Sequence, residues 1–426
     1  MRSKYIFLLL LTLLASCKQG GQGTIGESKG PTMPGEITRD SLVDYSTLDT
    51  LIFHPDNRVY ESSDILDVVK LIRLETNEEC LIGSVGKVQF VGGMYYLLDD
   101  YTARNAIHVF DTQGNHVHSL KRIGRGPGEY KDILDFDVDI SKNLFILNSI
   151  GNIIEYDSLL QYKRTINQEI AIRTISVYNG LIIGIAHGDT YKNPQGRLLH
   201  FLSSDGRSLS GLMRYSQGSS NYNNRRSTLT KSKDKLYVNI PFSPIIYSID
   251  TAFNVKAEYY LVLNYIRSDG KTANRFFTDP HKDFFFSDQL IYCSTALPLV
   301  TDKPTFYTNY SGFSTSGQTF FPKRVRGRLS DGVLNPLQST LIGLTEDGIG
   351  ISVMDVSYLQ GNLRFESARV ITDSTGVRHR VYSDSFLGSD TLPGSLYDII
   401  KNLNETDNPC IVLVKLKPFG SWNGKS

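Results

Sequence analysis

The segment Ala106-Ile-His-Val-Phe-Asp-Thr-Gln-Gly114 decides the fold, because its apolar strand ending at Asp111 recurs along the chain. The same ending is found at Asp157, Asp205 and Asp250, at intervals of 46, 48 and 45 residues. A fixed period of this length, filled with strands, is typical of a β-propeller in which each repeat forms one four-stranded blade. A long β-sandwich with similar turns is the alternative.

Short runs of β-branched and aromatic residues, each bounded by Gly, Asn or Asp, predict the strands of these blades. They lie at residues 94–99, 106–110, 144–147, 181–185 and 235–238. We expect the first four blades to end near residues 120, 166, 212 and 262. The rest of the chain has room for two enlarged or three compact blades, which gives six or seven in all.

The C-terminal part predicts one short helix followed by a closing strand. Ser395 is a suitable cap, residues 396–403 follow helical spacing, and Asn408-Pro409 ends the helix. The strand at residues 411–416 then has a natural partner in residues 68–74. This pairing closes the ring of blades and leaves no open sheet edge.

The composition is that of a globular protein. Of the 426 residues, 40% are hydrophobic and 21% are charged, which excludes wholesale disorder. The 45 basic and 44 acidic residues produce no overall positive field. Nucleic acid is therefore not an expected partner.

The first residues predict export. Arg2 and Lys4 precede an apolar run at residues 5–14 that is too short to span a bilayer. The sequence Leu14-Ala15-Ser16-Cys17 resembles the lipobox of bacterial lipoproteins, which implies cleavage after residue 16 and lipidation of Cys17. A plain secretory signal with an incidental cysteine is the alternative.

These patterns divide the chain into four parts. We expect a signal peptide at residues 1–16, and a lipidated Cys17 with a flexible tether and an irregular arm at residues 17–64. The propeller is expected at residues 65–418 and a tail at residues 419–426. Cys80, Cys293 and Cys410 form no CxxC or Cys/His cluster, so buried free thiols are favoured over one disulfide, and neither a metal nor a cofactor is expected.

Several short motifs resemble the six-bladed β-propeller lipoproteins of Bacteroidetes, which are related in architecture to NHL-repeat propellers. They are Ile72-Arg-Leu-Glu-Thr76, Leu81-Ile-Gly-Ser84, Ile123-Gly-Arg-Gly-Pro-Gly-Glu-Tyr130, Asp135-Phe136 and Asp407-Asn408-Pro409. The resemblance spans about residues 65 to 417. It implies six blades, the last two enlarged, in an envelope protein associated with nutrient capture, and it brings no catalytic residues.

The loop Arg122-Ile-Gly-Arg-Gly-Pro-Gly-Glu-Tyr130 is the first candidate ligand site. Its glycines let a ligand approach the backbone, and N–H groups beside two arginines suit a carboxylate, sulfate or phosphate. The candidate ligand-binding residues are Arg122, Arg125, Gly126, Gly128, Glu129 and Tyr130. The alternative is a tight inter-blade turn whose last two residues hold a neighbouring strand.

Arg324 and Arg326 form the second candidate, on an alternating strand that continues to Arg328. Aromatic residues lie upstream of this strand, at Tyr307, Tyr310 and Phe313. A row of guanidinium groups near aromatic rings suits an acidic sugar or a sulfated glycan. The alternative is a solvated strand face.

Two other clusters of polar residues have both a chemical and a structural interpretation. Asp135, Asp137 and Asp139 share one strand face, where they can bind Ca²⁺ or act as acid and base on a glycoside. A purely structural role is favoured. His116 and His118 can likewise start a Zn²⁺ site, but no third ligand is identifiable, and we expect surface histidines.

Two functions compete on this basis. The first is a non-catalytic binding module, held at the outer membrane by its lipid, that binds a glycan, a peptide or a partner envelope protein. The residues after Cys17 lack an acidic run, so a periplasm-facing position is preferred. The second is a glycan hydrolase or lyase that uses Asp135 and Asp137 in the propeller channel. The binding module is favoured, since no catalytic motif is present.

Overall fold

Eighteen segments of the chain are described by the computed structural model. They are residues 48–53, 55–61, 66–100, 105–186, 192–193, 196–214, 228–232, 234–240, 243–266, 272–276, 283–286, 291–298, 307–315, 318–326, 341–360, 369–372, 378–381 and 399–417. The predicted signal peptide, Cys17, the tether up to residue 47 and the tail at 419–426 lie outside these residues.

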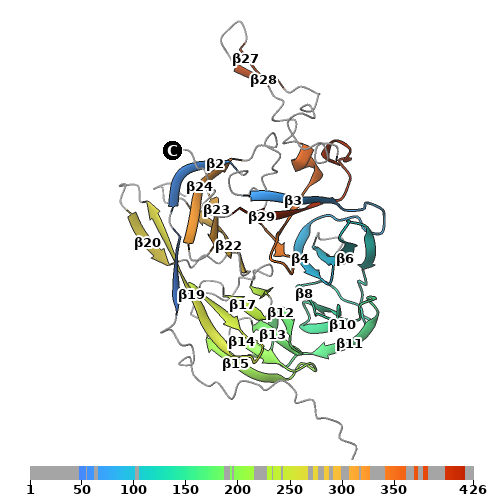
Figure 1. The fold of residues 1–426 in the computed structure, drawn as a ribbon. Helices are drawn as coiled ribbons and strands as arrows, with labels where there is room; N and C mark the ends of the chain where they lie inside the picture. Colours follow the sequence, from blue (N-terminus) through green and yellow to red (C-terminus); the bar gives the residue numbers. More distant parts are fainter. Residues whose placement is uncertain are drawn as a thin grey trace, which may run out of the picture. The chain divides into compact units, whose positions relative to one another are not determined.

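The chain forms an all-β propeller of four-stranded antiparallel blades (Figure 1). Three sheets follow the chain in simple order. The first contains β4 (Val85–Val91), β5 (Met94–Asp99), β6 (Ala106–Asp111) and β7 (His116–Leu120). The second contains β8 (Asp135–Val138), β9 (Leu144–Leu147), β10 (Asn152–Tyr156) and β11 (Tyr162–Asn167). The third contains β12 (Ile172–Tyr178), β13 (Leu181–Ala186), β14 (Arg197–Leu202) and β15 (Ser208–Arg214).

Two further sheets are larger, and a separate two-stranded ribbon follows them. One sheet contains β16 (Leu229–Ser232), β17 (Lys235–Asn239), β18 (Ile245–Ile249) and β19 (Val255–Ile266), with β1 (Asp49–Phe53) and β20 (Thr272–Phe276) added to β19. The other contains β21 (Asp283–Phe286), β22 (Ile291–Pro298), β23 (Tyr307–Thr315), β24 (Gln318–Arg326) and β2 (Pro55–Glu61). The ribbon contains β27 (Arg369–Thr372) and β28 (Arg378–Val381).

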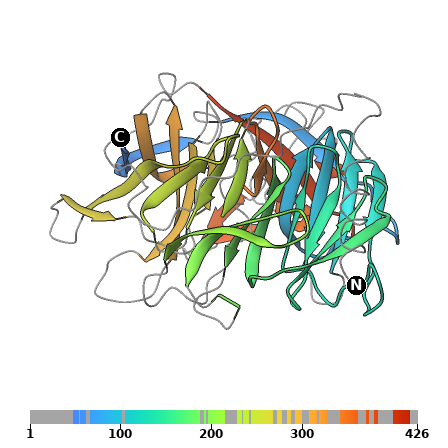
Figure 2. The same ribbon diagram turned by 90° about the horizontal axis from the view of Figure 1, so that it is seen from below.

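The last sheet joins the two ends of the domain, as the sequence predicts. It contains β25 (Gly343–Leu344), β26 (Gly350–Met354), β29 (Cys410–Leu416) and β3 (Leu66–Arg73). β29 pairs antiparallel with β3, from Cys410 opposite Arg73 to Leu416 opposite Leu66. Figure 2 shows this red C-terminal strand beside the blue N-terminal one. The predicted strands at 94–99, 106–110, 144–147, 181–185 and 235–238 are also confirmed.

The N-terminal segment forms a strap across three sheets. β1 pairs in parallel with β19, β2 pairs in parallel with β24, and β3 pairs with β29. Residues 49–53 and 55–61, which we expected in an irregular arm, are therefore strands. The physical reason is that an outer strand leaves unpaired N–H and C=O groups, which an added strand satisfies.

Buried apolar side chains fill the spaces between successive sheets. One cluster joins the closing sheet to the β4–β7 sheet, and others join β4–β7 to β8–β11, β8–β11 to β12–β15, and β12–β15 to β16–β19. Five blades are thus packed face to face, not the six predicted. The β21–β24 sheet is not joined by these four clusters, and it adds β2 in parallel as the β16–β19 sheet adds β1.

A recurrent turn connects the third and fourth strands of four blades. In the first, the Asp111 carboxylate accepts hydrogen bonds from the backbone N–H of Gln113 and of Asn115. Asp157 and Asp250 make the same turn. In the third blade the equivalent residue is Ser203, whose hydroxyl accepts from the N–H four residues later, and not Asp205 as predicted. The period is therefore 46, 46 and 47 residues.

Two of these turns are each bound by a glutamate that follows the preceding sheet. The Glu75 N–H donates to the Gly114 carbonyl oxygen at 2.8 Å, and the Glu75 carboxylate accepts from the His116 N–H at 2.8 Å. Glu169 and Gly206 repeat the arrangement at another blade junction. These contacts fix the outer ends of neighbouring blades to each other.

Glycine is required at these two turns for a steric reason. Gly114 and Gly206 both have φ of +89°, and a Cβ on either would collide with a backbone oxygen of the preceding sheet. The oxygens belong to Arg73 and Asn167 respectively. The left-handed backbone and the close approach together leave no room for a side chain.

Helix is rare in the described part of the chain. Residues 356–360 and 399–401 are helical. The second segment lies within the predicted helix at 396–403, while its expected cap, Ser395, lies outside the described residues. No helix among the described residues is long and apolar enough to cross a membrane.

Candidate functional site

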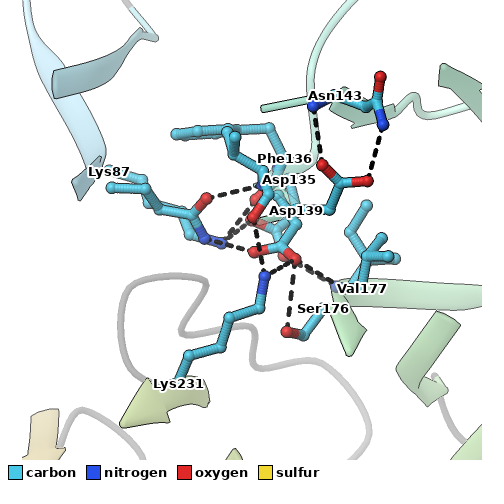
Figure 3. Close-up of polar contacts among 12 residues, drawn as sticks. Lys87, Asp135, Phe136, Asp139, Asn143, Ser176, Val177 and Lys231 are labelled. Carbon is cyan, nitrogen blue, oxygen red and sulfur yellow. Dashed lines mark hydrogen bonds and ion pairs between the residues drawn. The ribbon is translucent and has the colours of Figure 1, made fainter. Parts of the chain in front are cut away.

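Asp135 joins three innermost strands of the propeller. Its Oδ1 accepts from the Lys87 ammonium on β4 at 2.7 Å, and its Oδ2 accepts from the Ile175 N–H on β12 at 2.9 Å (Figure 3). Lys87 also donates to the Phe136 carbonyl oxygen at 2.8 Å. Both side chains are almost fully buried. Burial raises the pKa of the Asp135 carboxyl, and the ammonium beside it opposes that rise.

Asp137 makes a second set of such contacts, two residues along β8. Its Oδ1 accepts from the Gln89 amide at 2.5 Å. Its Oδ2 accepts from the Val177 N–H at 2.6 Å and from the Lys231 ammonium at 2.5 Å (Figure 3). Lys231 lies on β16, so its side chain reaches past β12 to β8. The two carboxylates thereby link the innermost strands of four consecutive sheets.

The alternation of β8 explains this placement. Successive side chains of a strand point to opposite faces, so Asp135 and Asp137 share one face while Phe136 and Val138 enter the apolar cluster on the other. Asp139 lies in the following turn, where its carboxylate accepts from the N–H and the amide of Asn143. The three acids are therefore structural.

A cavity of about 590 Å³ lies beside this polar layer. Residues of β4, β8, β12, β16, β21 and β25 line it. Much of its wall is apolar, including Phe90, Val91, Tyr178 and Leu344. Its volume is within the range of small-molecule binding sites.

Residues that bind Asp135 or Asp137 line this cavity, whereas the two aspartates do not. Lys87, Gln89 and Lys231 line it, but Asp135 and Asp137 are not among the lining residues. Lys231 is the more accessible of the two lysines, with 31% of its side chain exposed against 3% for Lys87. The layer therefore presents donor groups to the cavity.

Two other carboxylates lie at the wall of the cavity. Asp139 is held in its turn, and the Glu346 carboxylate accepts from the Gly92 N–H at 2.6 Å. The cavity thus combines a donor-rich side, two acceptor groups and apolar walls. Such a set suits an uncharged or singly charged polar ligand better than a polyanion, because the two carboxylates repel negative charge.

The glycine-rich loop makes contacts that favour its structural interpretation. The Glu129 carboxylate accepts from the Gly126 N–H at 2.8 Å, so this N–H already has a partner. The Tyr130 hydroxyl is buried and donates to the Leu120 carbonyl oxygen at 2.9 Å. The backbone of Arg122 also pairs with that of Tyr130. The loop joins the first blade to the second.

Two more of the predicted loop residues pack against the next blade. The Gly128 carbonyl oxygen accepts from the Tyr156 hydroxyl at 2.9 Å, and the Arg122 guanidinium lies over the Tyr156 ring at 6.0 Å. Arg125 is exposed. Anion binding by this loop stays a prediction.

The second candidate ligand site lies in a different sheet from the strands that the glycine-rich loop connects. Arg324 and Arg326 are in β24, where they pair with Val59 and Glu61 of the strap strand β2. Arg328 lies outside the described residues. A ligand at this strand also stays a prediction.

Of the two histidines of β7, His116 has a local partner. His116 shares the Ser119 hydroxyl with His108, at 2.8 and 2.7 Å. Within the described segments, no group of three or more His, Cys, Asp or Glu residues is placed to hold a metal ion. Cys80 and Cys410 are buried free thiols, as expected.

Sequence reasoning found Asp135 and Asp137 but missed the groups that bind them. Lys87 and Gln89 alternate on a strand, and each precedes its aspartate partner by 48 residues. That interval is close to the period of the turns, and it signals equivalent positions on adjacent innermost strands. Lys231 follows Asp137 by 94 residues, about twice that interval, as expected for an innermost strand two sheets further along the chain.

The fold and the cavity together place this protein in the class of all-β propellers with a pocket on the innermost strands. The chain matches, over residues 54–415, the family described as "Domain of unknown function (DUF4934)", and it belongs to this family. No curated protein matches it. The predicted relation to lipoproteins with NHL-like propellers stays a prediction, apart from the blade number, which is five and not six.

A comparison with solved structures supports the fold. One is the crystal structure of a protein from Bacteroides fragilis NCTC 9343 that is described as exported. It has 15% sequence identity and a TM-score of 0.63, and the match covers 87% of this chain and 100% of the other. A glutaminyl cyclase from Myxococcus xanthus has 14% identity and a TM-score of 0.31, with 54% and 95% covered, and this similarity is too low to support an argument.

Proposed function

We propose that this protein is an exported, lipid-anchored propeller of the bacterial cell envelope that binds a ligand and catalyses no reaction. The cavity on the innermost strands is the observation that carries the proposal. It is large enough for a small ligand or a side chain of a partner, and its walls belong to strands that are held by buried polar contacts.

The positions of Asp135 and Asp137 support binding over catalysis. Both carboxylates are buried, both bind a lysine and a backbone N–H, and neither lines the cavity. A glycosidase needs two carboxyl groups that reach the scissile bond from opposite sides. The hydrolase or lyase alternative required Asp135 and Asp137 as catalytic carboxylates, and their positions do not support that role.

Export and lipid attachment rest on the N-terminal sequence, and the exported relative from Bacteroides fragilis supports the first of them. We infer an outer-membrane position for the lipid on Cys17, with the propeller facing the periplasm. Fractionation of cells that express the wild type or Cys17→Ala tests this. We expect the variant to leave the membrane fraction, and wild type and variant found alike in the soluble fraction would contradict the anchor.

Ligand binding is tested with the intact mature protein against a panel of oligosaccharides and peptides. The comparison variant is Ser232→Trp, which fills the cavity without removing a charged group. We expect a panel member to bind the wild type and to lose affinity for the variant. A panel without a binder, or binding that Ser232→Trp does not change, would overturn the cavity as the binding site.

A further inference from the structure

We propose that the cavity binds a sugar that carries one carboxylate, a uronic acid, and that the Lys231 ammonium recognises the carboxylate. This inference rests on the proposed function and names the ligand class of the same cavity. It follows from three observations: the direction of the polar layer, the remaining donor of Lys231, and the acceptors at the cavity wall.

The polar layer gives the cavity a positive side. Asp137 is 1% exposed, and donors from three strands surround its carboxylate. Lys231, by contrast, lines the cavity and is 31% exposed in its side chain. Of this ion pair, Lys231 is therefore the member that a ligand in the cavity can contact.

Lys231 has a donor for such an anion. An ammonium group carries three N–H donors. Two are used, by the Asp137 carboxylate at 2.5 Å and by the Val138 carbonyl oxygen at 2.9 Å. Among the residues that the structure describes, none accepts the third. A ligand carboxylate that takes this donor forms a charge-assisted hydrogen bond.

The cavity wall selects the rest of the ligand. Asp139 and Glu346 present acceptor oxygens, which bind hydroxyl groups and repel further negative charge. Phe90 and Leu344 offer apolar surface to the C–H face of a sugar ring. Hydroxyl groups, one negative charge and an apolar ring face occur together in a uronic acid, whereas a polysulfated glycan carries more charge and a fatty acid has no hydroxyls.

The test is calorimetric titration of the intact mature protein with D-galacturonic acid and D-glucuronic acid, each paired with its neutral sugar. Because Lys231→Met alone leaves Asp137 buried without its cation, the variant is Lys231→Met/Asp137→Asn, which removes both charges. We expect a uronic acid to bind the wild type, with at least about tenfold lower affinity for the double variant. The matched control is Lys163→Met, because Lys163 also binds a buried carboxylate, that of Glu155, outside the cavity.

Several results would overturn the inference. They are equal binding of the neutral sugar, an unchanged affinity in the double variant, and uronic acid binding that survives the cavity-filling Ser232→Trp. If a neutral sugar or a peptide binds and Ser232→Trp abolishes it, the uronic acid assignment fails while the binding function stands. If no panel member binds, both fail.

Discussion

The side chain of Asn408 binds the backbone of Cys80, which lies 328 residues earlier in the chain. Its amide donates to the Cys80 carbonyl oxygen at 2.8 Å and to the Glu75 carbonyl oxygen at 2.7 Å, and its Oδ1 accepts from the Ile82 N–H at 2.8 Å. One buried side chain thus joins the segment before the closing strand to the segment that follows β3.

Asn408→Ala is therefore expected to destabilise the protein strongly. The change removes the partner of two buried backbone groups, at Cys80 and Ile82, and one of the donors to the Glu75 carbonyl oxygen, at a cost of about 3 kcal/mol or more. Urea unfolding measures the difference. Asn404→Ala, at an exposed position four residues earlier, is the control and is expected to change the free energy of unfolding by less than about 0.5 kcal/mol. Equal effects of the two substitutions would contradict the role of Asn408.

Gly206→Ala tests the contact between blades. Gly206 and Gly151 have the same φ of +89°, but a Cβ at Gly206 would meet Asn167, whereas a Cβ at Gly151 would meet open space. Gly151→Ala should therefore cost only the backbone strain, about 1–2 kcal/mol, and Gly206→Ala clearly more. Both are measured by urea unfolding. Similar costs would mean that the turn moves away from the neighbouring sheet.

Asp250→Asn tests the charge in the recurrent turn. Burial alone would raise the pKa of the Asp250 carboxyl, but hydrogen bonds from Asn254 and Ala252 outweigh it and hold the pKa below its usual value. Because the folded-state pKa is lowered, the carboxylate contributes stability above the unfolded pKa of about 3.9, and this is lost as the pH falls through the folded-state value.

The variant should therefore be less stable than the wild type at pH 7, and the difference should shrink as the pH falls below about 4. Asparagine keeps an acceptor for the turn but carries no charge. Urea midpoints at pH 7 and at acid pH measure both values. A difference that stays constant with pH would show that the charge does not stabilise the turn.

Lys87→Met tests the buried ion pair of the channel. It leaves Asp135 buried and without its cation, which we expect to cost about 3–5 kcal/mol. The double variant Lys87→Met/Asp135→Asn removes both charges and keeps an acceptor for the Ile175 N–H. It should be more stable than Lys87→Met alone in thermal or urea unfolding. A double variant that is less stable than Lys87→Met would mean that the Asp135 carboxylate stabilises the fold through its backbone N–H donors even without the ammonium.

Arg125→Ala tests whether a uronic acid binds at the glycine-rich loop or in the cavity. Because the Gly126 N–H is bound to Glu129, we expect binding of a uronic acid to be unchanged in this variant. The same titration that tests Lys231 measures it. Loss of binding in Arg125→Ala would restore the loop as the anion site.

The parts of the fold that follow a regular pattern were predictable from the sequence. The turn at Asp111 and its equivalents gave the period, and the apolar runs between them gave the strands. Pairing of β29 with β3 followed from the need to close a sheet edge. The third turn was predicted at Asp205 but begins at Ser203, because a hydroxyl can replace a carboxylate at the first position of the turn.

Contacts that depend on packing between distant segments were not predictable in the same way. The strap strands β1 and β2 have mixed sequences, and their pairing depends on sheet edges that only the folded chain provides. Lys231 lies 94 residues after Asp137, about two periods, but the sequence does not show that its side chain reaches Asp137 across the intervening strand. The contacts of Lys87 and Gln89 could have been predicted from the sequence, because each residue precedes its aspartate partner by 48 residues.

The strap also determines how the molecule responds to a pull at its N-terminal end. Tension applied there loads the ladder between β1 and β19 first, and the ladder between β2 and β24 next. The junction of β3 with β29 bears the load only after both have parted. Two strand pairs therefore have to separate before force reaches the closing sheet.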